Sequence, residues 1–339
     1  MSPSRTVSSL LVVTVLLAAM TAASCTAGRQ PAPPPQRHSG FATAQDGTPI
    51  YYERMGSGDA VLFIHGLGGN HAVWFHQVPV FAARHTVITI SQRGFAPSGG
   101  ARQGHPLDVL VADAVAVLDT LDIDRAHVVG QSMGGWTALG LALHRPDRLR
   151  SVVLADSFAG IVDPVLAEHN RSMMDKARAL ADRPPPLGVH PALGADFSRR
   201  DPAEAYLYQT LTTFGSPAPG AIAARLGETV ADPALLSANE VPALFVVGEH
   251  DLIFPPALVE RAAGRLARST VVIVPDSGHS PYYERPGRWN DIVLDFIEHR
   301  RRERVTVSVR RNPFYDLVRP GGRRCGLTRR GRTTRPQHR

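Results

Sequence analysis

Short apolar runs alternate with stretches of helical periodicity along the middle of the chain. The apolar runs cover residues 61–64, 86–90, 126–129, 151–154, 243–247 and 270–274. The helical patterns between them cover 71–84, 107–121, 133–144, 255–267 and 286–299. Continuous runs rich in β-branched residues are typical of strands buried on both faces of a parallel sheet. The pattern predicts an α/β fold with a doubly wound, mostly parallel sheet and helices on both faces.

A hairpin is predicted ahead of this alternating pattern. The turn signal Asp46-Gly47 separates two extended runs, at 41–45 and 50–54. We therefore expect the folded core to begin at residue 40.

One long interval between Ser157 and Glu240 contains no strand-like run. Its helical pieces lie at 165–181, 202–211 and 221–230. We predict that residues 157–240 form a helical lid near the carboxyl edge of the sheet. The alternative is a set of extra core helices with no role at the active site. The core itself is then formed by residues 40–156 and 241–299.

The first 25 residues have the features of a secretory signal. Arg5 precedes an apolar run over 10–20, which is too short for a bilayer that needs about 20 residues. Residues 22–25 (AASC) resemble a bacterial lipobox, in which cleavage leaves a lipid-modified cysteine. We expect an extracytoplasmic protein, anchored to the membrane through Cys25 or else simply secreted. The Pro-rich residues 26–39 would form an extended linker.

Composition and charge exclude several classes of protein. The net charge is +7, but residues 300–339 contain 14 arginines against Glu303 and Asp316, so this tail carries +12 and the rest of the chain −5. The tail has too few apolar residues to pack, so we expect it to be disordered, and the acidic body is not expected to bind nucleic acid specifically. The two cysteines, Cys25 and Cys325, cannot make a disulfide framework or a four-ligand zinc site.

A G-x-S-x-G motif is the first candidate for chemistry. Gly130, Ser132 and Gly134 follow the predicted strand 126–129 and lie where the helix 133–144 begins. Glycines there permit a sharp turn that exposes the serine oxygen, and the helix start offers free N–H groups to a developing negative charge. We predict that Ser132 is a nucleophile. The alternative is a glycine-rich turn with an idle serine.

A serine nucleophile needs a base that is held by an acid. His279 follows the last predicted strand, and Asp251 follows the strand before it. The chain order Ser132, Asp251, His279 matches one of the folds that use this triad. Three other acids lie at nearby loop ends: Asp156, Glu249 and Asp276. Asp156 is the main competitor of Asp251, and the other two are expected at the surface.

A second glycine-rich segment, 64–69 (IHGLGG), follows the first strand of the alternating pattern. Glycines such as Gly66 let the backbone approach a substrate oxygen closely. We predict that the backbone N–H groups of Leu67 and Met133 form an oxyanion hole. His65 is expected to hydrogen-bond the loop backbone and to keep this hole open.

These motifs together resemble the α/β-hydrolase superfamily, specifically its lidded branch of esterases, enol-lactonases and serine perhydrolases. The resemblance covers about residues 40–299 and is carried by HGLG at 65–68, QRGFAPS at 92–98, GQSMGG at 130–135 and the loops of Asp251 and His279. It implies Ser132 as nucleophile, Asp251 as acid and His279 as base, in a site without cofactor or metal. Arg93, in the second motif, is expected to support the cleft.

The expected activity is hydrolysis of a carboxylic ester or lactone, a small molecule, through an acyl-enzyme on Ser132. One alternative is hydrolysis of a carbon–carbon bond in a vinylogous diketone with the same triad. Another is a non-catalytic binding lipoprotein. Because each buried methylene contributes about 0.8 kcal/mol until the pocket is full, we expect a preference for acyl groups of about four to eight carbons.

Overall fold

The computed structural model describes residues 36–100, 104–180, 186–213 and 219–299. The chain divides into a unit of residues 1–36, almost all outside these ranges, and a unit of residues 37–339 that holds every element below. Residues 1–25 with Cys25, most of the linker, and the tail 300–339 lie outside the described residues, so the expectations for them stay predictions. Within the described ranges, no helix is both long enough and apolar enough to cross a membrane.

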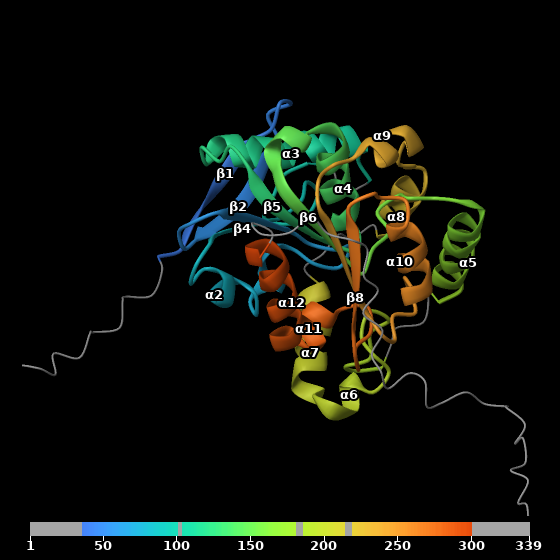
Figure 1. Cartoon of the computed structure of the whole chain (residues 1–339). Coiled ribbons are helices and arrows are strands. Elements are labelled where there is room, and N and C mark those ends of the chain that lie inside the picture. The colour runs from blue at the N-terminus through green and yellow to red at the C-terminus, as the bar shows by residue number, and fades with distance from the viewer. Residues whose placement is uncertain (1–35, 101–103, 181–185, 214–218, 300–339) are drawn as a thin grey trace, which may run out of the picture. The chain divides into compact units, whose positions relative to one another are not determined.

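An eight-stranded sheet forms the centre of the fold (Figure 1). Its strand order is β1-β2-β4-β3-β5-β6-β7-β8, in which the pairs β1–β2 and β2–β4 are antiparallel and the other five pairs are parallel. The strands are β1 His38–Thr43, β2 Pro49–Met55, β3 Ala60–Ile64, β4 Thr86–Ile90, β5 Ala126–Gln131, β6 Leu149–Ala155, β7 Ala243–Gly248 and β8 Ser269–Val274. The predicted α/β class with a mostly parallel sheet is confirmed.

Helices pack on both faces of the sheet. Successive residues of a strand point to opposite faces, so the continuous apolar strands present side chains on both faces that the helices bury. Leu62 and Ile64 face a core shared with α3 (Leu107–Thr120), α4 (Gly134–His144) and α10 (Pro256–Ala263). Val61 and Phe63 face a second core that includes Trp74 and residues of α2, α11 and α12. The elements on this second face are η1 His71–Trp74, α2 Val78–Phe81, α11 Pro281–Glu284 and α12 Pro286–His299.

Two sequence expectations need correction at the edges of these elements. The first strand begins at His38, which pairs with Arg54 of β2, so the ladder includes two residues that were assigned to the linker. The single helix expected over 71–84 is instead the short pair η1 and α2, with a break before Val78. Pro79 explains the break, since it has no N–H and is tolerated only in the first turn of a helix.

The interval 157–240 contains helices and, among its described residues, no strand. The helices are α5 Pro164–Leu180, α6 Phe197–Arg200, α7 Pro202–Thr212, α8 Pro219–Gly227 and α9 Pro233–Ala238. Figure 1 shows α6 and α7 close together at the bottom of the view, and α5, α8 and α9 on its right-hand side. Their contacts with the site are described below.

Candidate active site

Ser132 lies in the tight turn between β5 and α4. Its φ of +49° is in the left-handed region that non-glycine residues seldom adopt, and its N–H donates to the carbonyl oxygen of Ala155 at 2.8 Å. A Cβ on Gly134 would lie 2.3 Å from the carbonyl oxygen of Ile64, and a Cβ on Gly130 would lie 2.3 Å from that of Gly134. The two glycines therefore allow β3, β5 and α4 to pack closely enough to hold this turn.

Ser132, His279 and Asp251 form a continuous hydrogen-bonded chain. The Nε2 atom of His279 lies 2.9 Å from Ser132 Oγ, and its Nδ1 lies 2.8 Å from Asp251 Oδ2. The Oδ1 atom of Asp251 accepts the N–H groups of Ile253 at 2.8 Å and Phe254 at 2.9 Å. With Nδ1–H directed at the carboxylate, Nε2 is free to accept the serine proton, so this arrangement can generate a nucleophilic oxygen.

The side chains of His279 and Asp251 are almost completely buried, whereas Ser132 is partly exposed. His279 is 4% exposed and Asp251 is 2% exposed. The Phe254 ring packs on the His279 ring with centroids 5.4 Å apart, and Gln131 Nε2 donates to the His279 carbonyl oxygen at 3.2 Å. These contacts fix the imidazole before substrate arrives, and electrostatic interactions are strong in such a water-excluded place.

The segment around Gly66 lies directly against Ser132. A Cβ on Gly66 would be 2.1 Å from Gln131 Oε1 and 3.2 Å from Ser132 Cβ, so only glycine fits without displacement. Leu67 follows at the carboxyl end of β3, and Met133 is the residue that precedes α4. The structure therefore places the segment that contains Leu67 beside the serine that Met133 follows directly in the chain.

His65 is held by the backbone of its own loop and the next. Its Nδ1–H donates to the carbonyl oxygen of Gly66 at 2.7 Å, and its Nε2 accepts the N–H of Gln92 at 3.0 Å. Burial lowers the pKa of His65 to about 4. The ring is therefore neutral at pH 7 and connects the Gly66 and Gln92 loops, which is the loop-supporting role expected from its position.

Arg93 is a buried cation that pairs with two carboxylates. It donates to Asp113 through Nε at 2.7 Å and Nη2 at 2.6 Å, and to Asp46 through Nη1 at 2.6 Å. Arg93 and Asp113 are 6% and 4% exposed. The hydrogen bonds that Arg93 donates to Asp113 raise the pKa of Arg93 above its ordinary value. Arg93 thus fixes the loop that carries Gln92, without touching the serine itself.

Replacing Arg93 should destabilise the fold strongly, because Asp113 would remain buried without a partner. We expect Arg93→Met to lower the free energy of unfolding by about 3–5 kcal/mol, measured by urea denaturation, and added Asp113→Leu to recover much of the loss. Arg145→Met is the control, since Arg145 pairs with Asp147 at the surface and should change stability by less than about 1 kcal/mol. Equal effects of the two Arg→Met variants would contradict this account.

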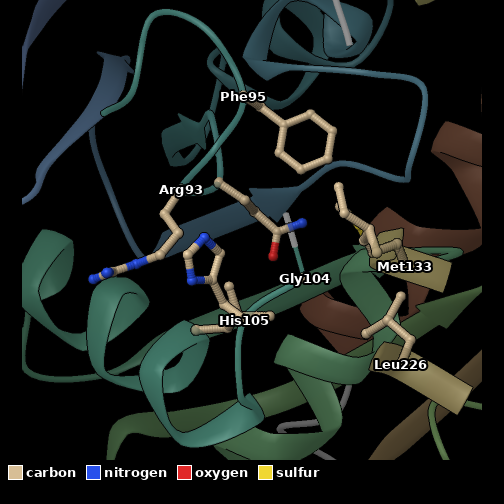
Figure 2. Close-up of a pocket in the computed structure, with 9 residues that line it drawn as sticks. Arg93, Phe95, Gly104, His105, Met133 and Leu226 are labelled. Atoms are coloured by element: carbon tan, nitrogen blue, oxygen red, sulfur yellow. The ribbon is translucent and has the colours of Figure 1, made fainter. Parts of the chain in front are cut away.

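A pocket with largely apolar walls lies beside Met133 (Figure 2). Figure 2 shows Phe95, Met133 and Leu226 around it, with Arg93 extending away on the other side. Leu226 and Ile222 belong to α8, so the 157–240 interval supplies one wall of the pocket. The remaining lining residues are Gln92, Gly104, His105 and Leu110.

The same interval also contacts the loop that carries His279. Tyr208 of α7 places its hydroxyl 2.8 Å from Ser280 Oγ. The buried Glu284 accepts the N–H of Gly278 at 2.8 Å through Oε1 and that of Gly194 at 2.9 Å through Oε2. Glu284 therefore joins the segment before α6 to the residue that precedes His279.

These contact residues were not recognised from the sequence. Tyr208 lies in a stretch with helical periodicity that does not single out its hydroxyl, and Glu284 follows His279 by five positions without a recognisable motif. The tyrosine hydroxyl meets Ser280 across 72 positions, and Glu284 meets Gly194 across 90, so only the tertiary structure reveals these roles.

The competing acids occupy different places. Asp156 is fully buried behind the triad, where its Oδ1 accepts the N–H of Gly248 at 3.0 Å. Glu249 accepts the N–H of Asp276 at 3.1 Å, at a partly exposed position on the far side of the loop. The His279 ring is bonded to Asp251, so Asp251 is the acid that the geometry offers to the histidine.

Comparison with known proteins places the chain in a family. A family model described as the alpha/beta hydrolase fold matches residues 59–286. A Mycobacterium tuberculosis protein named "Putative non-heme bromoperoxidase BpoC" is 31% identical over 258 residues, which cover 73% of this chain and 97% of that protein.

Solved structures extend the comparison to the whole core. An esterase from Thermogutta terrifontis is 26% identical to this chain, with a TM-score of 0.65. The match covers 78% of this chain and 98% of the esterase chain. The enol-lactonase from Burkholderia xenovorans LB400 is 26% identical with a TM-score of 0.62, over 76% and 99% of the two chains. The chain belongs to the α/β-hydrolase fold family, within its esterase and lactonase branch, as the motifs predicted.

Proposed function

We propose that this protein is a serine hydrolase that cleaves carboxylic esters or lactones through an acyl-enzyme on Ser132. The contact between Ser132 Oγ and His279 Nε2, with Asp251 on the opposite ring nitrogen, carries the proposal. The esterase and the enol-lactonase among its structural relatives support the substrate class.

Acylation begins when His279 takes the hydroxyl proton of Ser132 as Oγ attacks the carbonyl carbon. The carbonyl oxygen becomes an oxyanion, which the N–H groups of Leu67 and Met133 would stabilise by about 3 kcal/mol each. His279 then gives its proton to the departing alcohol, and Asp251 stabilises the imidazolium during the interval. The products of this half-reaction are the free alcohol and an ester of Ser132.

Deacylation repeats these steps with water. His279 removes a proton from a water molecule, the hydroxide attacks the acyl carbon, and collapse of the second tetrahedral intermediate returns the proton to Ser132 Oγ. The acid is released, and the site is restored. For a lactone, the alcohol and the acid leave as one molecule.

A substrate panel tests the proposed reaction against the alternatives. The full-length protein should hydrolyse p-nitrophenyl esters or a lactone with saturation kinetics, and turnover of a vinylogous diketone alone would replace ester cleavage by carbon–carbon bond hydrolysis. Absence of turnover on the whole panel, together with no reaction with a serine-directed probe, would leave a non-catalytic binding protein.

The pocket beside Met133 has a cavity volume of only about 20 Å³, so an acyl chain can enter it only where the α8 wall moves, and we propose that this wall sets the preference for acyl length. We expect the p-nitrophenyl esters of about four to eight carbons to give the highest kcat/KM. Leu226→Ala removes part of the α8 wall and should move this maximum to longer chains. Leu236→Ala in α9 is the matched control, because Leu236 is buried but does not line the pocket. An unchanged profile in both variants would show that the pocket does not hold the acyl group.

A further inference from the structure

Asp156 is a buried acid that the proposed reaction does not use. It follows β6 with φ of +49°, and its N–H donates to the carbonyl oxygen of Val246 at 2.8 Å. Its side chain is completely buried, and one carboxylate oxygen of Asp156, one of Asp251 and one nitrogen of His279 all lie within 4.8 Å of one another. A second carboxyl group is therefore built into the back of the triad.

The two carboxyl groups are hydrogen-bonded to very different extents. Asp251 accepts three hydrogen bonds, from the N–H groups of Ile253 and Phe254 and from His279 Nδ1. Asp156 accepts one, from Gly248, and its Oδ2 is buried with no donor among the described residues. Since hydrogen bonds from donors stabilise the charged form of a carboxyl group, the negative charge belongs on Asp251.

A hydrogen bond between the two carboxyl groups requires a proton. A carboxylate oxygen of Asp156 lies within 4.8 Å of one of Asp251, and two ionised carboxylates offer only acceptors to each other. Burial, and next the charge of Asp251, raise the pKa of Asp156 well above its ordinary value. Two adjacent buried carboxyl groups commonly share one proton for this reason.

We propose that Asp156 is a permanently protonated carboxylic acid that donates a hydrogen bond to Asp251 and so positions the acid of the triad. In its catalytic consequence, this inference rests on the proposed function of Ser132, His279 and Asp251. The Oδ1 atom of Asp156 accepts from Gly248, and the protonated Oδ2 donates to the carboxylate of Asp251. Asp251 then has a fourth donor, and no second negative charge lies beside His279.

Other titratable groups face Asp156 from the elements packed around it. They are Asp251 and His279 from the loops, Glu284 and Tyr282 from α11, and Tyr208 from α7. Burial raises the pKa of Tyr208 to about 12 and also raises that of Tyr282, so both phenols are neutral at pH 7. Among these five groups only His279 can become a cation, and the charges of Asp251 and Glu284 both favour the protonated form of Asp156.

The first test compares two replacements of Asp156 in the full-length protein. An asparagine reproduces a protonated aspartate, with an oxygen for Gly248 and an N–H for Asp251, so Asp156→Asn should keep kcat/KM within about threefold of the wild-type value. Asp156→Leu removes the donor and should lower kcat by about tenfold or more with little change in KM. If Asp156→Asn loses as much activity as Asp156→Leu, or if neither loses any, the proposal is overturned.

The second test measures stability against pH and does not depend on catalysis. A carboxyl group that is protonated only in the folded state makes stability fall as pH rises above its ordinary pKa of 3.8, because the unfolded chain has already released the proton. The urea midpoint of Asp156→Asn should therefore rise steadily relative to that of the wild type from pH 5 to pH 8.

The control for this second test is Asp147→Asn. Arg145 lowers the pKa of the exposed Asp147, so this variant should gain no stability relative to wild type as pH rises. A relative stability of Asp156→Asn that stays constant or falls with pH would refute a protonated Asp156, whatever the enzyme hydrolyses. Failure of the ester assays alone, with the stability result intact, would instead overturn only the proposed function.

Discussion

Ser132→Ala should lower kcat by a factor on the order of 10⁶, because a triad that loses its nucleophile keeps only the catalysis of the oxyanion hole and binding. The fold should be unaffected, since Ser132 Oγ bonds only to the His279 ring among the described residues. Measurement of kcat on a p-nitrophenyl ester and of thermal unfolding gives both quantities. Ser237→Ala, on the exposed surface of α9, is the control and should match wild type.

A residual activity of Ser132→Ala within tenfold of wild type would contradict the account. Such a result would place the nucleophile elsewhere and leave the hydrogen bond between Ser132 and His279 as a structural feature. The same comparison on a lactone would show whether both substrate classes depend on this serine.

Asp251→Asn should lower kcat on the order of 10⁴-fold with little change in KM. The amide would present an N–H to His279 Nδ1 and would thereby favour the tautomer that has its proton on Nε2, facing Ser132. Asp276→Asn is the matched control, because Asp276 is exposed with φ of +51°, a conformation that asparagine tolerates. If Asp156→Asn costs more than Asp251→Asn, the role of acid passes to Asp156.

Much of the site could be predicted because it is built from strand ends. Ser132, Asp251 and His279 each follow a continuous apolar run, and the carboxyl ends of parallel strands meet at one edge of a sheet. The three residues follow β5, β7 and β8, which lie in one half of the sheet, so the hydrogen bonds that join them agree with the order of the strands. The glycines of the motif could also be recognised, because a strand that turns sharply into a helix leaves no room for side chains. In the structure, a Cβ at Gly134 would collide with the end of β3.

The remaining features depend on contacts between segments far apart in sequence. Whether α7 would reach the His279 loop could not be read from its periodicity, because Tyr208 meets Ser280 across 72 positions. The protonation of Asp156 likewise depends on its burial beside Asp251. From the sequence, Asp156 was a candidate for the acid of the triad because it follows a strand. Only the hydrogen bonds that Asp156 and Asp251 accept distinguish the roles of these two acids.

Covalent labelling of the serine tests the central claim most directly. The full-length protein is treated with a fluorophosphonate, its residual ester hydrolysis is followed, and the modified peptide is identified by mass spectrometry. The account predicts one phosphonyl group per chain on Ser132, formed in proportion to the loss of activity, and no labelling of Ser132→Ala. Loss of activity without modification of Ser132, or full activity after Ser132 is modified, would contradict it.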